Sequence, residues 1–195
     1  MHTRQQKEVA RKCLAEWIEP PNTSNIPEQP RNLWSNYLFE KKQREGRAAK
    51  VSKRLEIQSL RWVTLGYHYD WEHRMYSDYY QPFPADLSEL CADIVRAASS
   101  SWTLDAQAAI VNLYHPGSSM GGHQDDAELS KDHPIVSLSL GCPCVFLLGG
   151  LTKEEAPLPI ILRSGDAIVF GGSSRLRYHG VPKIWSTGKG SGESK

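Results

Sequence analysis

Short apolar runs separated by turns dominate the second half of the chain. Glycine, proline and aspartate stand between the runs, and these residues favour turns through their backbone geometry and local hydrogen bonds. Several short strands with such turns between them are typical of an antiparallel sandwich or jelly roll. The runs cover residues 109–114, 135–140, 145–148, 159–162 and 167–170.

The first half of the chain begins with helical patterns. Apolar residues recur at helical spacing across residues 4–17, namely Val9, Cys13, Leu14 and Trp17. Pro20-Pro21 is expected to end this helix, because proline cannot continue the backbone hydrogen bonding. A second helix is expected from residue 33 to about residue 49.

A strand and a third helix follow in the first half. Residues 61–69 are rich in β-branched and aromatic side chains, which predicts a strand. The apolar stripe within residues 87–95 predicts a helix, and Asp86 with Glu89 three positions on resembles a capping box at its start.

These patterns predict an α+β fold, with a helical half before an antiparallel sandwich or jelly roll. We expect a helical N-terminal part over residues 1–107 and a strand-rich core over residues 108–184. Residues 185–195 are mostly small and polar, and we expect them to be disordered.

Composition limits the class of protein but does not name a partner. Of the 195 residues, 39% are hydrophobic and the formal net charge is +1, as in ordinary soluble chains. No run approaches the roughly 20 apolar residues of a membrane span, and the polar N-terminus does not resemble a secretory signal. Cys142 and Cys144 have no second cysteine pair with which to form a zinc site, so a reducing compartment fits best.

Charge is concentrated in residues 41–54, where Glu45 is the only acidic residue among seven basic ones. A solvated helix face is the usual meaning of such a run. A surface that contacts nucleic-acid phosphates is the alternative. The basic residues are Lys41, Lys42, Arg44, Arg47, Lys50, Lys53 and Arg54.

The strand half contains the sequence His123-Gln124-Asp125. Side chains alternate in an extended segment, so His123 and Asp125 face the same way. With a second histidine from a distant strand, they would make the 2-His-1-carboxylate set of non-haem Fe(II) oxygenases. His179 is the candidate. Taken alone, a histidine and an aspartate at this spacing are weak evidence, and a surface loop is then the favoured explanation.

Asn112 and Tyr114 stand about ten residues before this motif. The same period of two places both side chains on one strand face. If that face is buried, their polar groups need hydrogen-bond partners, and a bound dicarboxylate would provide them. Backbone groups and solvent would also satisfy them.

The motifs together resemble the AlkB family of Fe(II)/2-oxoglutarate dioxygenases, in order and in spacing over roughly residues 5 to 184. Residues 61–71 and Pro82-Phe83-Pro84 are most similar to the eukaryotic branch called AlkB homologue one. The remaining motifs are Asn112 to Gly117, His123 to Asp125, Pro134 to Gly141, Phe146 to Gly150, Ser164 to Asp166 and Ser174 to Gly180.

This resemblance implies a double-stranded β-helix in residues 108–184 and a nucleotide-recognition region within residues 1–107. It implies that His123, Asp125 and His179 bind Fe(2+), and that 2-oxoglutarate and O2 are co-substrates. It also implies oxidative demethylation of methylated bases in DNA or tRNA, by a monomer without a membrane partner. The nucleus is the expected location, with the mitochondrion and cytoplasm as alternatives.

The resemblance assigns further contacts as well. Asn112 and Tyr114 would contact 2-oxoglutarate. Trp62 aligns loosely with the tryptophan that stacks on the target base in bacterial AlkB. The base itself must be single-stranded or flipped out of its stack.

One departure separates this chain from the family pattern. The family continues to a last strand with an R-x-N-x-x-x-R-like motif, whose arginines clamp 2-oxoglutarate, and nothing after His179 resembles it. The resemblance therefore implies a jelly roll with its last strand missing, a domain truncated at both ends and weak turnover. Two alternatives follow: a catalytically inactive protein that binds metal and nucleic acid, and a cupin-like metal protein without redox chemistry.

Overall fold

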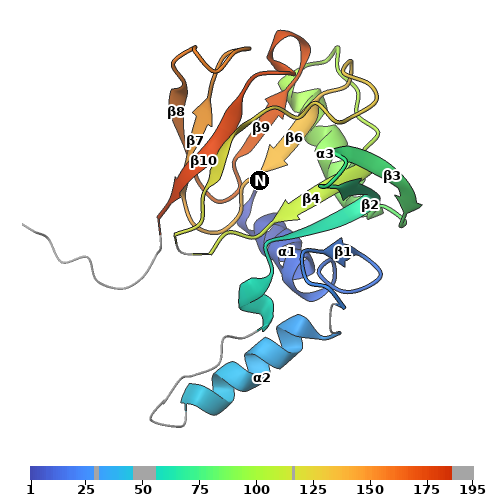
Figure 1. The fold of residues 1–195 in the computed structure, drawn as a ribbon, viewed down its shortest axis with the longest axis vertical. Coiled ribbons are helices and arrows are strands. Elements are labelled where there is room, and N and C mark those ends of the chain that lie inside the picture. The colour runs from blue at the N-terminus through green and yellow to red at the C-terminus, as the bar shows by residue number, and fades with distance from the viewer. Residues whose placement is uncertain (29–30, 46–55, 116, 186–195) are drawn as a thin grey trace, which may run out of the picture. The chain divides into compact units, whose positions relative to one another are not determined.

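The computed structural model describes residues 1–28, 31–45, 56–115 and 117–185. The chain, drawn as a ribbon in Figure 1, forms two compact units. The helical unit comprises Lys7–Leu113 and Ala127–Ser130. The strand unit comprises Met1–Gln6, Tyr114–Asp126 and Lys131–Lys195. The predicted domain boundaries remain a prediction.

The helical unit is organised around β2 (Trp62–Asp70). This strand pairs antiparallel with β1 (Thr23–Ser24), β3 (Met75–Tyr80) and β4 (Ala108–Asn112). Its buried residues Val63 and Leu65 contribute to the apolar core. The helices of this unit are α2 (Leu33–Glu45), α3 (Ala85–Ala98), the short 3-10 turn η1 (Glu56–Ser59) and the part of α1 (Thr3–Ala15) that follows Gln6.

The strand unit holds two antiparallel sheets. One has the order β5-β10-β7-β8 and the other pairs β6 with β9. The strands are β5 (Met120–His123), β6 (Ile135–Leu138), β7 (Cys144–Leu148), β8 (Leu158–Leu162), β9 (Ala167–Phe170) and β10 (His179–Ile184), with the 3-10 turn η2 (Gly172–Ser174) before β10.

Apolar side chains from both sheets form the core of the strand unit. Phe146 and Leu162 come from the four-stranded sheet, and Phe170 comes from the two-stranded one. The ring centroids of Phe146 and Phe170 lie 6.0 Å apart. This is the face-to-face packing of a β-sandwich, so the expected α+β jelly-roll architecture is confirmed.

The predicted elements largely agree with the structure. The strand predicted at residues 61–69 is β2, and the five predicted in the second half correspond to β4, β6, β7, β8 and β9, with ends that differ by at most two residues. The helix expected from residue 33 is α2, which is described as far as Glu45, and positions 46–49 lie outside the described residues. No helix in the described part of the chain is long and apolar enough to cross a membrane.

The capping-box prediction for α3 is wrong. The helix begins after Pro84, and no side chain caps it. Asp86 lies in the first turn and forms an ion pair with Lys12 of α1. A carboxylate in the first turn still interacts favourably with the helix dipole, but its partner is a distant lysine rather than the backbone.

Strand β3 was not expected, because its sequence Met-Tyr-Ser-Asp-Tyr-Tyr lacks an apolar alternation. Aromatic pairs across the hairpin explain why it forms. Tyr67 lies opposite Tyr80 with ring centroids 4.8 Å apart, and Tyr69 lies opposite Tyr76 at 5.3 Å. Such cross-strand pairs stabilise an antiparallel ladder by about 0.2–1 kcal/mol each.

Candidate metal centre

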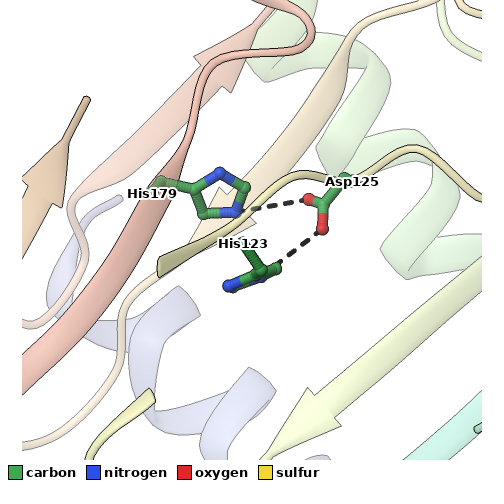
Figure 2. Close-up of side chains that lie close together, drawn as sticks. All are labelled: His123, Asp125 and His179. Atoms are coloured by element: carbon green, nitrogen blue, oxygen red, sulfur yellow. Dashed lines mark ion pairs between the residues drawn. The ribbon is translucent and has the colours of Figure 1, made fainter. Parts of the chain in front are cut away.

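Strand pairing in the strand unit brings two histidines together. His123 is the last residue of β5, His179 is the first residue of β10, and the two are direct partners in the antiparallel ladder. Asp125 follows β5 by two residues. Figure 2 shows the three side chains converging, with the carboxylate of Asp125 facing both imidazole rings.

The geometry of the cluster suits one metal ion. One carboxylate oxygen of Asp125 lies 3.5 Å from Nε2 of His123, and the other lies 3.5 Å from Nε2 of His179. The three possible ligand atoms all lie within 4.8 Å of one another. Two imidazoles and one carboxylate on one side leave positions for other ligands, which is the arrangement of non-haem Fe(II) oxygenases.

Backbone carbonyls orient both imidazole rings. Nδ1 of His123 lies 3.0 Å from the carbonyl oxygen of Gly121, and Nδ1 of His179 lies 3.1 Å from that of Arg177. Since a carbonyl only accepts, each Nδ1 carries the proton and donates. Each Nε2 then keeps its lone pair for a metal. This second layer of contacts is the usual way in which proteins fix the tautomer of a histidine ligand.

The cluster has a buried side and an open side. The His179 side chain is only 10% exposed, and the rings of Phe146 and Phe170 lie 5.8 and 4.7 Å from its ring. The side chains of His123 and Asp125 are 38% and 32% exposed. A metal held here would therefore have an apolar wall behind it and access for small molecules in front.

Residues 12–193 match the 2OG-Fe(II) oxygenase superfamily. The chain belongs to this superfamily. The donor set described above fits the iron in the family's name, and the family implies Fe(2+), 2-oxoglutarate and O2 as cofactor and co-substrates.

Individual relatives confirm the resemblance to AlkB. The chain is 38% identical over 183 residues to the mouse nucleic acid dioxygenase ALKBH1. This alignment covers 92% of this chain and 47% of the relative. It is 40% identical over 133 residues to the fission yeast tRNA demethylase abh1, covering 67% of this chain and 44% of the relative. The solved structure of OsALKBH1 matches with a TM-score of 0.66 and 25% identity, covering 94% of this chain and 82% of that one. The chain thus spans about half the length of the curated relatives it matches.

Interactions between the charged groups of the cluster shift the pKa values of Asp125 and His179. Burial alone would raise the pKa of Asp125, but the neighbouring His179 and His123 outweigh it and lower the pKa. Burial alone would lower the pKa of His179, but the ion pair with Asp125 and the hydrogen bond to the Arg177 carbonyl raise it. Without metal, the charged pair of Asp125 and His179 is therefore favoured.

We expect metal binding to weaken as the pH falls, because a metal needs the neutral imidazole of His179. The raised pKa keeps a proton on this ring at a higher pH than the usual value of about 6.5. The affinity should fall about tenfold per pH unit for each proton displaced. Titrations with Mn(II) between about pH 5 and 8 measure this dependence. A constant affinity over that range would contradict the coupling.

The predicted 2-oxoglutarate contacts lie near the end of β4. Asn112 is the exposed last residue of this strand and belongs to the helical unit. Tyr114 lies two residues farther on, in the strand unit, where its hydroxyl is 3.6 Å from the sulfur of Met120. Burial raises the pKa of Tyr114 to about 12, so the phenol stays protonated and available as a donor. Their role toward 2-oxoglutarate remains a prediction.

Trp62 stacks in parallel on Trp71 within the helical unit. Their ring centroids are 4.1 Å apart and the planes differ by 7°. Trp71 is 42% exposed and was not expected to belong to a site. The sequence feature that could have indicated Trp71 is its position directly after the predicted strand, next to Asp70. This position places Trp71 at the turn of the hairpin.

Sequence reasoning also missed the wall of the metal centre. Phe146 and Phe170 lie on predicted strands, but only the folded sandwich places their rings beside His179. Their place in continuous apolar strands marks them as core, and nothing in the sequence marks them as neighbours of a ligand.

Proposed function

We propose that this chain is an Fe(II)/2-oxoglutarate-dependent dioxygenase that removes methyl groups from bases in DNA or tRNA. The observation that carries the proposal is the cluster of His123, Asp125 and His179, with both Nδ1 atoms held by carbonyls. The relatives support the substrate class, because they include a nucleic acid dioxygenase and a tRNA demethylase.

In this proposal, His123, Asp125 and His179 hold Fe(2+). When bound, iron with 2-oxoglutarate and O2 supplies the oxidant that hydroxylates an N-methyl group, which then leaves as formaldehyde while 2-oxoglutarate becomes succinate and CO2. Asp125 offsets part of the positive charge of the metal. Phe146 and Phe170 keep water from the buried side of His179. Asn112 and Tyr114 contact 2-oxoglutarate through their amide and hydroxyl groups.

We assign nucleic-acid binding to the helical unit. The exposed ring of Trp71, supported from behind by Trp62, offers a flat surface suited to an unstacked base. The basic run at residues 41–54 would contact phosphates. Only Lys41 and Lys42 have described side chains there, and both are exposed, whereas residues 46–55 lie outside the described residues.

A panel of methylated single-stranded substrates tests this function. It includes DNA with N6-methyladenine and tRNA with 1-methyladenine, in which the methyl group is on nitrogen. It also includes tRNA with 5-methylcytosine, in which the methyl group is on carbon and would be oxidised without release as formaldehyde. Nucleoside mass spectrometry after incubation with Fe(II), 2-oxoglutarate and O2 should show loss of at least one modified base. Asp125→Ala serves as the control, and it should leave every substrate unchanged. Equal, unchanged levels with the metal-loaded parent would reject the demethylase proposal.

Replacing Lys50, Lys53 and Arg54 with alanine should weaken the binding of single-stranded nucleic acid and flatten its dependence on salt. The slope of log K against log salt is negative, and each lost phosphate contact reduces its magnitude by about 0.7–0.9. Fluorescence anisotropy at several salt concentrations measures the slope. Three exposed basic residues elsewhere, Arg4, Lys7 and Arg163, form the control set. An equal slope for the parent and the first variant would leave residues 41–54 as an ordinary solvated face.

By analogy with the AlkB homologue one branch, we further propose that the protein works as a monomer in the nucleus, with the mitochondrion or cytoplasm as alternatives. Light scattering of the purified protein and imaging of a tagged chain measure these two properties.

A further inference from the structure

Two side chains outside the metal cluster join the segments that carry its ligands. The amide nitrogen Nε2 of Gln124 lies 2.5 Å from the carbonyl oxygen of Leu176 and donates to it. In the opposite direction, the guanidinium of Arg175 donates to the carbonyl oxygen of Asp125, also at 2.5 Å. The segment after β5 and the segment before β10 are thus each bonded to the backbone of the other.

The backbone ladder alone leaves the ligands poorly fixed. Strand β5 ends at His123, so Asp125 lies beyond the regular pairing. The pairing of β5 with β10 is also irregular, because the register shifts between His179 and Val181. A metal site needs its ligands held to within about 0.5 Å, so additional contacts must position the carboxylate.

Arg175 has the character of a positioning group. Its side chain is buried, with the residue only 4% exposed, and its Nε donates to the carbonyl of His133 at 3.1 Å. Burying a guanidinium is costly unless it is well hydrogen-bonded. Its planar fork reaches two carbonyls on different segments, which a lysine cannot do with one ammonium group.

Gln124 makes the second contact between these segments, and it lies in the sequence between the candidate ligands His123 and Asp125. Its neighbours His123 and Asp125 face the cluster, whereas its own amide reaches Leu176 at 2.5 Å and Leu151 at 3.4 Å. Leu176 stands three residues before His179. The Gln124 amide therefore links the segment that carries His123 and Asp125 to the segment that precedes His179.

We propose that Gln124 and Arg175 are positioning residues that together set the spacing of Asp125 and His179 for metal binding. This inference rests on the proposed function only in that the cluster must bind a divalent metal. Neither residue touches the reacting atoms. Their effect is on the geometry of the ligands, so it must appear in metal affinity and in the spectrum of the bound ion.

Mn(II) titration followed by electron paramagnetic resonance tests the positioning role of Gln124 and Arg175. Arg175→Met and Gln124→Leu should each weaken Mn(II) binding by about 10- to 100-fold, as losses behind a metal ligand usually do. Both should also broaden the signal of the bound ion, because the ligands take up several arrangements. Arg175→Lys should recover part of the affinity by reaching one of the two carbonyls.

Arg163→Met is the matched control, since Arg163 is an exposed arginine of the same unit that is not part of the metal cluster. It should bind Mn(II) like the parent. Thermal unfolding of the metal-free proteins separates geometry from folding, and the more conservative Arg175→Lys and Gln124→Leu should remain folded. The double variant of Gln124 and Arg175 should lose less than the sum of the two effects, because both fix the same pair of segments.

Three results would overturn the inference. Parent-like affinity and spectra in both Arg175→Lys and Gln124→Leu would reject the positioning role of these two residues and leave the metal cluster standing. An equal loss of affinity in Arg163→Met would do the same. A parent chain that binds no Mn(II) would reject both the metal cluster and the positioning role of Gln124 and Arg175.

Discussion

Asp125→Ala and His179→Ala are each expected to lower the affinity for Fe(II) or Mn(II) by more than about 100-fold, beyond the usual effect of removing a group behind a ligand. Asp125 supplies the only carboxylate of the cluster, and it faces both histidines at 3.5 Å. Its loss removes a ligand and also leaves two imidazoles without the negative charge that offsets a divalent cation. Anaerobic calorimetry with Fe(II), or paramagnetic resonance with Mn(II), measures the affinity.

Asp126→Ala is the matched control, because it removes an exposed carboxylate next to the cluster that is not one of the three candidate ligands. It should bind metal like the parent. Metal binding by Asp125→Ala and His179→Ala at parent strength would mean that the ion, if any, is held elsewhere.

Phe170→Ala is expected to destabilise the strand unit by about 3–5 kcal/mol. The residue is 3% exposed and packs against Phe146 and His179, so truncation opens a cavity in the core and beside a ligand. Because whole domains are stable by only about 5–15 kcal/mol, this is a large fraction of the total. Urea unfolding, followed by circular dichroism, measures the free energy of unfolding.

Ile161→Ala provides the control from the same unit, since Ile161 is 52% exposed on β8. It should cost less than about 1 kcal/mol, as surface changes usually do. A similar small cost for Phe170→Ala would contradict the assignment of the core between the two sheets.

The sequence was sufficient to predict one part of the cluster, because the geometry of His123 and Asp125 is local. The period of two put His123 and Asp125 on one side without any knowledge of the fold. His179 was named from the sequence as the candidate third ligand and the family resemblance supported it, but sequence spacing alone does not show which strand pairs with β5. Ladder pairing of His179 with His123 supplies that missing contact.

Other features depended on contacts that a linear pattern does not carry. Gln124 and Leu176 are 52 positions apart, and their bond appears only when β5 and β10 are adjacent. Strand β3 forms because its tyrosines meet those of β2, although its own sequence is polar. The start of α3 was misjudged because Asp86 pairs with Lys12, 74 positions away, and does not cap the helix.

The formation of succinate from 2-oxoglutarate by the iron-loaded chain, with a methylated oligonucleotide present, tests the central claim most directly. The account predicts one succinate for each base demethylated, with none above background in Asp125→Ala. Metal and nucleic-acid binding without any succinate would contradict it and would identify a catalytically inactive binding protein. Metal binding with neither succinate nor nucleic-acid binding would identify a cupin-like protein instead.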